Sequence, residues 1–347
     1  MPIAAYPLTF EPIYKEKVWG GRSLERLGRT LPGGVDARIG ESWELADLGT
    51  TSASGGGGGA ARSIITNGPL AGQSLHDAIT GEARALLGNL PLNEFGEFPL
   101  LLKYLDARQS LSVQVHPSPA YAAEHDDAFL KSEAWFIVDA DPGAVIYKGV
   151  HEGVTPEQLR AALEVNDDEA VVPLLIETPV RPGDCHYLPS GTCHALGAGV
   201  LVAEVQTPSD TTFRVYDWGR IGRELHVDQA LACITFGPPE SWKYEKLSLL
   251  NHNGTSRTRL VVCEYFRIDR IEAGPGFDEE LSYNQPAVWM VLAGEARLTC
   301  DAAEPVTLTS GRTVYIPPGM PNARLHVTEP LDWLEITFPQ ATSQRLA

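Results

Sequence analysis

A chain of 347 residues with 43% hydrophobic and 21% charged residues has the composition of a globular protein that is long enough for two domains. Its formal net charge of −18 argues against binding to nucleic acid, which needs a basic surface, but allows a small phosphorylated ligand in a cleft that holds a few cations. With no apolar run long enough for a bilayer, no signal-peptide layout and five cysteines without a CxxC pair, we expect reduced thiols, a cytoplasmic location and no membrane contact.

Short strands dominate the pattern along the chain. The 33 glycines and 26 prolines favour many strands joined by turns over long helices. Runs rich in β-branched and aromatic residues predict strands at 99–107, 111–117, 134–140, 143–149, 186–191 and 200–206, and then at 259–271, 287–300, 306–319 and 331–338. The sequence therefore predicts a mainly β protein.

Helical patterns are fewer, and all of them precede residue 176. Residues 74–88 begin with a serine cap, and 155–175 begin with threonine followed by proline, which is good helix-start chemistry. A weaker third helix is predicted at 118–130. Residues 52–59 are rich in glycine, and because no Lys-Ser/Thr follows them, we interpret them as a flexible loop rather than a phosphate cradle.

One sequence frame occurs twice. Residues 183–194 read G-x5-P-x-G-x2-H, and residues 311–322 repeat the frame with Asn322 in place of His194. The segment SEAWFIV around Trp135 is echoed by PAVWMVL around Trp289. The tryptophans are about 150 residues apart and the frames 128, so the first half carries an insertion of roughly 26 residues, which the helical stretch after residue 154 could supply.

The repeat predicts two similar domains. Glycines make the tight turns of the frame, proline ends a strand, and the last position faces inward on the next strand. We expect two jelly-roll-like β-barrels: 1–237, a catalytic metal-binding domain with helical insertions, and 256–347, a barrel without metal ligands, joined by a linker at 238–255. The frame resembles the second conserved motif of the cupins, so the expected fold is a double cupin.

Residues of the first half have the chemistry of a metal site. Ser112, Gln114 and His116 alternate along one strand and so face the same side, Glu133 heads the next strand, and His194 ends the frame. Two imidazoles, a carboxylate and an amide oxygen suit a divalent ion with a position open for water or substrate. No thiolate is present, which argues against a closed structural zinc site.

The second half lacks two of these groups. At the positions of Glu133 and His194 it has Ala287 and Asn322, so both ligands are lost together, as a site in only one barrel predicts. Taken singly, the candidates also have plainer interpretations. Gln114 could be an ordinary strand residue, His116 could cap a strand, and Glu133 could be a solvated residue at a strand start. The histidines and the carboxylate could also hold Fe(II) as an oxygenase triad.

Five motifs in order resemble one known family. The motifs KEKVWGG, GESWEL, LSVQVHP, KSEAWFIV and PSGTCHALGAGVLVAEVQTPSDTTFRVYDWGR are together similar to the short bacterial form of type I mannose-6-phosphate isomerase, a zinc-dependent double cupin. The resemblance covers nearly the whole chain, and its main departure is the glycine-rich insert. It implies a metal-dependent aldose–ketose isomerase that interconverts mannose 6-phosphate and fructose 6-phosphate.

The resemblance also implies roles for individual residues. It implies four ligands for one Zn²⁺ per chain: Gln114, His116, Glu133 and His194. It implies three residues at the reacting carbons: the catalytic arginine Arg214, with Glu204 and Asp210 nearby. It implies three contacts with the sugar phosphate: Ser112 and Lys131 at the phosphate, and Trp19 near the mouth of the site.

Without the resemblance, three of these residues have other interpretations. Arg214 would pair with Asp217 as a surface salt bridge, Lys131 would be an exposed loop lysine, and Glu204 would only satisfy a buried partner. The proton transfer between C1 and C2 of the sugar needs a base. Glu204, Asp210 and a hydroxide on the metal are all candidates for it.

Two other functions are alternatives. An Fe(II) cupin oxygenase would use the two histidines and Glu133, but Gln114 as a fourth ligand and Lys131 count against it. A non-catalytic regulatory protein that binds a sugar phosphate would be expected to have lost a ligand, and all four are present. We expect a monomer, and the sequence leaves open the metal used in the cell, the range of sugars and the role of the C-terminal barrel.

Overall fold

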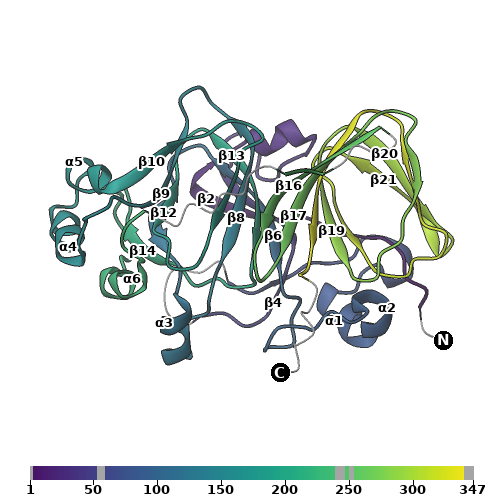
Figure 1. Cartoon of the computed structure of the whole chain (residues 1–347), viewed down its shortest axis with the longest axis horizontal. Coiled ribbons are helices and arrows are strands. Elements are labelled where there is room, and N and C mark those ends of the chain that lie inside the picture. The colour runs from purple at the N-terminus through teal and green to yellow at the C-terminus, as the bar shows by residue number, and fades with distance from the viewer. Residues whose placement is uncertain (1–2, 53–58, 239–246, 250–253, 340–347) are drawn as a thin grey trace. The chain divides into compact units, whose positions relative to one another are not determined.

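The computed structural model describes residues 3–52, 59–238, 247–249 and 254–339, and β-strands make up most of its regular structure (Figure 1). The mainly β prediction is therefore confirmed. The chain divides into two compact units, and we call residues 12–62 and 100–243 the first unit. The second unit consists of 1–11, 63–99 and 244–347. Most of the predicted linker lies outside the described residues, and the predicted domain boundaries stay a prediction.

The first unit is built from two antiparallel sheets. The six-stranded sheet has the order β11-β8-β13-β6-β3-β2, with β2 (Ile13–Gly21), β3 (Ile39–Leu45), β6 (Leu101–Ala107), β8 (Glu133–Ala140), β11 (Cys185–Leu188) and β13 (Val200–Gln206). The five-stranded sheet has the order β10-β9-β12-β7-β14, with β7 (Val113–Val115), β9 (Val145–Val150), β10 (Leu175–Pro179), β12 (His194–Leu196) and β14 (Phe213–Tyr216). A further pair joins β4 (Asp47–Leu48) to β5 (Ala61–Arg62).

The two sheets of the first unit share an apolar core. Side chains from both sheets pack together there, among them Leu105, Trp135, Ile137, Ile146 and Leu196. All seven residues of β6 are buried, because both faces of this central strand are covered. Since successive side chains point to opposite faces, a polar residue in this strand must face a buried interior.

Helices cover the outer face of the five-stranded sheet (Figure 1). They are α4 (Pro156–Val165), α5 (Asp168–Val171) with a 3-10 turn η3 (Val172–Leu174), and α6 (Val227–Cys233), while the short α3 (Pro119–Glu124) follows β7. Thr155 begins α4 with a capping box, in which its hydroxyl accepts the N–H of Gln158 and its own N–H donates to the Gln158 side chain. The predicted helix at 155–175 thus divides into three pieces, and α6 was not predicted.

The second unit also pairs two antiparallel sheets. Its seven-stranded sheet has the order β1-β22-β19-β24-β17-β16-β15, with β1 (Leu8–Thr9), β15 (Leu247–Leu249), β16 (Thr255–Val262), β17 (Arg267–Ala273), β19 (Ala287–Ala293), β22 (Thr313–Ile316) and β24 (Leu331–Thr337). Its four-stranded sheet has the order β18-β23-β20-β21, with β18 (Asp278–Glu280), β20 (Glu295–Cys300), β21 (Ala303–Thr309) and β23 (Arg324–Val327).

The helix predicted at 74–88 lies in the second unit as α1 (Leu75–Gly81) and α2 (Ala83–Leu87), which meet at Glu82. Ser74 caps α1 by accepting the N–H of Asp77, as a serine at that position predicts. Residues 53–58 of the predicted glycine-rich loop lie outside the described residues.

The internal repeat is visible in the strand order. In the first unit β8 and β9 are followed by α4 and α5 before β10, whereas in the second unit β20 runs into β21 after two residues. The predicted insertion is therefore where the helices are. Trp135 on β8 donates to Glu204 on β13 at 3.0 Å, and Trp289 on β19 donates to Glu335 on β24 at 3.3 Å. Each unit thus repeats a tryptophan–glutamate pair across neighbouring strands.

The repeated frame ends differently in the two units. His194 is the buried first residue of β12, as predicted. Asn322 instead lies in an exposed turn two residues before β23, with φ of 50°, and donates to Asp301. The prediction that the last frame position faces inward is wrong for Asn322, because asparagine readily adopts the left-handed conformation that this turn needs.

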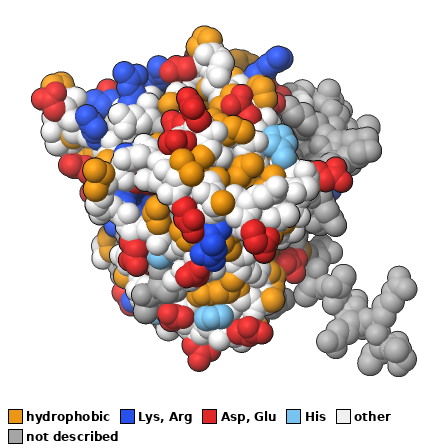
Figure 2. All heavy atoms as spheres, turned by 90° about the vertical axis from the view of Figure 1, so that its left-hand side faces the viewer, with side chains coloured by type: hydrophobic (Ala, Val, Ile, Leu, Met, Phe, Trp, Pro, Cys, Tyr) orange, Lys and Arg blue, Asp and Glu red, His pale blue; other side chains and the backbone are white. Residues whose placement is uncertain are grey.

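The surface reflects the acidic composition. On the face shown in Figure 2, Asp and Glu side chains are spread widely, whereas Lys and Arg gather mostly towards one upper corner. Within the described ranges, none of the helices combines the length and the apolar character needed to cross a membrane.

Candidate active site

The four predicted metal ligands come from three strands of the first unit. Gln114 is the central residue of β7 and His116 follows that strand directly. His194 begins β12 opposite Gln114 in the register of the five-stranded sheet, and Glu133 begins β8 in the six-stranded sheet. The carboxylate therefore reaches the imidazoles from the other sheet.

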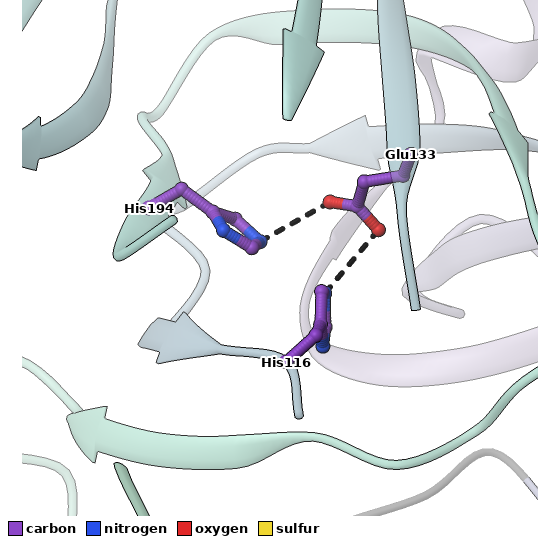
Figure 3. Close-up of side chains that lie close together, drawn as sticks. All are labelled: His116, Glu133 and His194. Atoms are coloured by element: carbon purple, nitrogen blue, oxygen red, sulfur yellow. Dashed lines mark ion pairs between the residues drawn. The ribbon is translucent and has the colours of Figure 1, made fainter. Parts of the chain in front are cut away.

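Figure 3 shows both imidazoles directed at the carboxylate of Glu133. Nε2 of His116 lies 3.3 Å from one carboxylate oxygen, and Nε2 of His194 lies 3.1 Å from the other. All three side chains are at most 1% exposed. The amide nitrogen of Gln114 lies 3.3 Å from Nε2 of His194. The structure thus brings all four predicted ligands together.

Backbone carbonyls orient both imidazoles. The Nδ1–H of His116 donates to the carbonyl of Thr211 at 3.0 Å, and the Nδ1–H of His194 donates to the carbonyl of Thr192 at 2.8 Å. These bonds leave a lone pair on each Nε2, the atom that faces Glu133. Histidines that bind a metal through one ring nitrogen commonly donate the other to such a carbonyl.

The donor atoms fit a divalent cation. Nε2 of His116 and Oε1 of Glu133 are fully buried and make no hydrogen bond, whereas the other oxygen of Glu133 faces the Lys131 ammonium. Buried polar atoms without a hydrogen bond are costly unless a further partner satisfies them. Within the described part of the chain, His116, Glu133 and His194 are the one group of three such ligand residues whose ligand atoms lie within 4.8 Å of one another.

Charges around the site keep the ligands in the states that bind metals. Burial lowers the pKa of His116 to about 3, and the Lys131 ammonium contributes, so the imidazole is neutral. Burial alone would raise the pKa of Glu133, but the Lys131 ammonium holds it well below its usual range. Lys131 is 5% exposed, with its ammonium 2.7 Å from Glu133, so the alternative of an exposed loop lysine is wrong.

A cavity beside these ligands is lined by the remaining predicted residues. Its walls include all six of them: Trp19, Ser112, Lys131, Glu204, Asp210 and Arg214. It also reaches Gln114, so the cavity leads to the metal ligands. Each of the six is less than a tenth exposed.

The guanidinium of Arg214 has no carboxylate partner among the described residues. It is 8% exposed and, within the described residues, makes no ion pair; its Nη1 donates to the carbonyl of Glu224 at 2.7 Å, and its Nε makes no hydrogen bond. Asp217 pairs instead with Arg220 at 2.8 Å and with Arg223. The surface salt bridge between Arg214 and Asp217 is therefore wrong. Burial lowers the pKa of Arg214, and the neighbouring Arg223 lowers it further, so an anionic ligand would relieve this site.

Glu204 is held by two strands next to its own. One carboxylate oxygen accepts the indole N–H of Trp135 at 3.0 Å, and the other lies 3.3 Å from the ammonium of Lys103. Glu204 therefore does satisfy a buried partner, and it also faces the cavity. Asp210 lies in the loop after β13, where one carboxylate oxygen accepts the N–H of Ser52 at 2.9 Å.

Sequence reasoning missed a second cluster on the cavity wall. Lys103 donates to Gln206 at 2.8 Å and lies 4.8 Å above the ring of Trp43. Trp43 donates to Glu41 at 2.6 Å, and Lys17 pairs with Glu41 at 2.9 Å. Lysine inside the apolar run PLLLKYLDA was a signal, because a strand buried on both faces has no solvated side for an ammonium.

Comparisons with known proteins point to one family. Residues 8–134 match the family model described as phosphomannose isomerase type I, catalytic domain. The chain is 36% identical over 322 residues to the mannose-6-phosphate isomerase of Streptococcus mutans, covering 90% of this chain and 93% of the relative. It is 38% identical over 274 residues to mannose-6-phosphate isomerase ManA of Bacillus subtilis, covering 76% and 78%.

A solved structure is similar over almost the whole length. The crystal structure of mannose 6-phosphate isomerase from Bacillus subtilis superposes with a TM-score of 0.81 at 29% identity. The match covers 96% of this chain and 99% of that one. Both units are therefore included in the similarity.

Proposed function

The chain belongs to the type I mannose-6-phosphate isomerase family, and from this premise we propose that it interconverts mannose 6-phosphate and fructose 6-phosphate by proton transfer through an enediolate. The observation that carries the proposal is Arg214, a buried cation that pairs with no carboxylate among the described residues, in a cavity that reaches the candidate metal ligand Gln114. An anionic substrate that also offers oxygens to a cation would satisfy both.

We infer that Gln114, His116, Glu133 and His194 hold one Zn²⁺ per chain. Two imidazoles, a carboxylate and an amide are nitrogen and oxygen donors that zinc accepts, and the cavity at Gln114 leaves access for a ligand. The fixed Nδ1 hydrogen bonds of both histidines support this assignment. A divalent ion held there would act as a Lewis acid on a sugar oxygen.

The proton transfer falls to the carboxylates of the cavity. Glu204 has its orientation set by Trp135 and its charge balanced by Lys103. Asp210 has its orientation set by the main chain of Ser52. A base within hydrogen-bond reach of the carbon-bound proton contributes roughly 10²–10⁴-fold to the rate. We propose that these two groups provide the general acid and base, while Arg214 donates to the negative charge that develops on the enediolate oxygens.

Lys131, Ser112 and Trp19 are proposed to contact the substrate. Burial lowers the pKa of Lys131, but Glu133 and Glu204 raise it above its usual value, so the side chain is a permanent cation. Ser112 presents a buried hydroxyl and Trp19 a buried indole to the same cavity. Binding energy at the phosphate end fixes the orientation of the reacting carbons.

The two alternatives have less support. An iron oxygenase would need only the two histidines and Glu133, and gives no reason for the cation of Arg214 beside them. A regulatory protein would need no fixed carboxylates near the ligands. We also propose a cytoplasmic monomer, with the second unit as support for the first.

One assay tests the proposal. Purified protein is incubated with mannose 6-phosphate, and the fructose 6-phosphate formed is measured with a coupling enzyme. Activity should vanish with a strong chelator and return with zinc, and mass spectrometry should find about one zinc per chain. Oxygen consumption without isomerisation would support the oxygenase instead, and tight binding of the sugar phosphate without turnover would support the regulator.

A further inference from the structure

Arg214 lies at an unpaired sheet edge. Its strand β14 is the last strand of the five-stranded sheet, with β7 on one side only. Along the free edge, the chain returns at His226, whose N–H donates to the carbonyl of Arg214 at 2.8 Å. The N–H of Arg214 donates in turn to Nδ1 of His226 at 3.2 Å. One residue thus satisfies both main-chain groups that a further strand would otherwise satisfy.

The imidazole of His226 accepts a hydrogen bond from strand β14 and not from its own helix, α6. His226 occupies the N-cap position of α6, yet its side chain makes no capping hydrogen bond. Residues at this position usually accept an N–H of the first helical turn. Its 5% exposure and its contact with Phe213, at 6.1 Å between ring centroids, fix the ring against β14.

The hydrogen bond requires a neutral ring. A main-chain N–H can only donate, so Nδ1 of His226 must carry a lone pair, and the ring proton must be on Nε2. An imidazolium carries protons on both nitrogens and would direct an N–H at the N–H of Arg214. Protonation therefore breaks this bond rather than weakening it.

We propose that His226 is a positioning residue that holds Arg214 towards the cavity through its main chain, and that it does so only while its imidazole is neutral. The proposal rests on the function proposed above for Arg214. It adds an acid-sensitive element that touches neither the metal ligands nor the substrate.

The charges around His226 favour the neutral ring on balance. Burial lowers its pKa; Glu224, 3.9 Å away and 83% exposed, opposes this, and the guanidinium of Arg214 lowers it further. On α6 itself, Asp228 pairs with Arg160 of α4 at 2.7 Å. Because the pKa in the folded protein lies below the usual 6.5, the bond is intact at neutral pH and is lost as the pH falls through the folded-state pKa.

Two variants test the proposal. His226→Asn places an amide oxygen near the position of Nδ1, an acceptor that does not titrate, whereas His226→Phe keeps the ring against Phe213 without any acceptor. We expect the Phe variant to lose about five- to tenfold in kcat at pH 7.5, which corresponds to about 1 kcal/mol, with little change in KM. We expect the Asn variant to stay near wild type at pH 7.5 and to keep its kcat at a lower pH than wild type does.

The fall of kcat at low pH must be distinguished from a loss of metal at low pH. Wild type and His226→Asn carry the same metal ligands, so the metal content of each sample is measured at every pH, and only fully loaded samples are compared. The proposal fails if the Phe variant keeps its kcat within twofold of wild type. It also fails if kcat of the Asn variant falls over the same acidic pH range as kcat of wild type.

A spectroscopic measurement is independent of turnover. Imidazole ¹⁵N shifts of the full-length protein should show His226, identified by its absence in the Asn variant, with its proton on Nε2 and a titration midpoint below 6.5. The amide shift of Arg214 should change with the same midpoint. A protein that shows this titration but no isomerase activity would refute the proposed function and leave the hydrogen bond intact; a proton on Nδ1 would overturn the inference itself.

Discussion

Replacing Arg214 by methionine should lower activity strongly without destabilising the protein. The guanidinium is 8% exposed, forms no ion pair within the described residues and lies beside Arg223. The substitution loses the bond to the Glu224 carbonyl, which is worth about 1.5–3 kcal/mol for a charged donor. It also removes a buried charge whose desolvation costs several kcal/mol. The two effects nearly cancel or favour methionine by roughly 1–2 kcal/mol.

Arg29 provides the matched control. Its side chain is 9% exposed, but its guanidinium contacts both carboxylate oxygens of Glu44, at 2.8 and 2.7 Å, and Glu44 is 3% exposed. Arg29→Met leaves that carboxylate without its cation, which should cost about 3–5 kcal/mol. At roughly 2 °C per kcal/mol for a protein of this size, its Tm should fall by about 6–10 °C, while that of Arg214→Met stays near wild type or rises.

The measurements are thermal unfolding with saturating zinc and the coupled isomerase assay. Loss of one preorganised donor to the developing charge should lower kcat of Arg214→Met by about 10²–10³-fold. Arg29→Met should stay within a few fold of wild type at a temperature where it is folded. If Arg214→Met loses as much stability as Arg29→Met, or keeps more than a tenth of its activity, Arg214 is a structural residue and the reasoning is wrong.

Three further substitutions probe the rest of the site. Glu133→Gln leaves Lys131 without its buried partner and should reduce bound zinc from about one per chain to almost none by mass spectrometry, whereas the exposed Glu280→Gln should keep it. Glu204→Gln retains an acceptor for Trp135, so its Tm should stay within a few degrees while kcat falls about 10²-fold or more; full activity would exclude Glu204 as acid or base. Burial raises the pKa of Glu41, but Lys103 and Lys17 lower it to about 2, so its ion pairs stabilise the fold above about pH 4.5 and are lost as the pH falls towards 2. The Tm difference between metal-free wild type and Glu41→Gln should therefore shrink over that range, and a constant difference would contradict this.

The two units differ in how their buried charges are paired. In the first unit, Glu204 on β13 lies opposite Lys103 on β6; in the second, Glu335 on β24 lies opposite Asp269 on β17. The two carboxylates of the second unit are bound by Arg257, with Asp269 at 2.9 Å. Buried charges there are paired with one another, whereas in the first unit Arg214 remains for a ligand.

Local sequence was enough to predict that the four candidate metal ligands lie together. Strand alternation sets Gln114 and His116 on one side, and the turn frame of glycine and proline sets His194 at the start of a strand, so these positions follow from short-range geometry. The same frame misled at Asn322, where a turn two residues longer delays the next strand.

The folding of loops and the pairing of strands decided the rest. Asp217 could have met Arg214 or its near neighbours Arg220 and Arg223, and only the folded loop selects the latter two. Lys103 meets Glu204 because β6 and β13 are adjacent, and His226 meets Arg214 because β14 is an edge strand. Residue types and spacing along the chain thus determined which groups this protein has for chemistry. The tertiary structure alone determined which of their charges are neutralised by neighbours and which are left for a ligand, because the partner of each charge depends on how the loops fold and the strands pair.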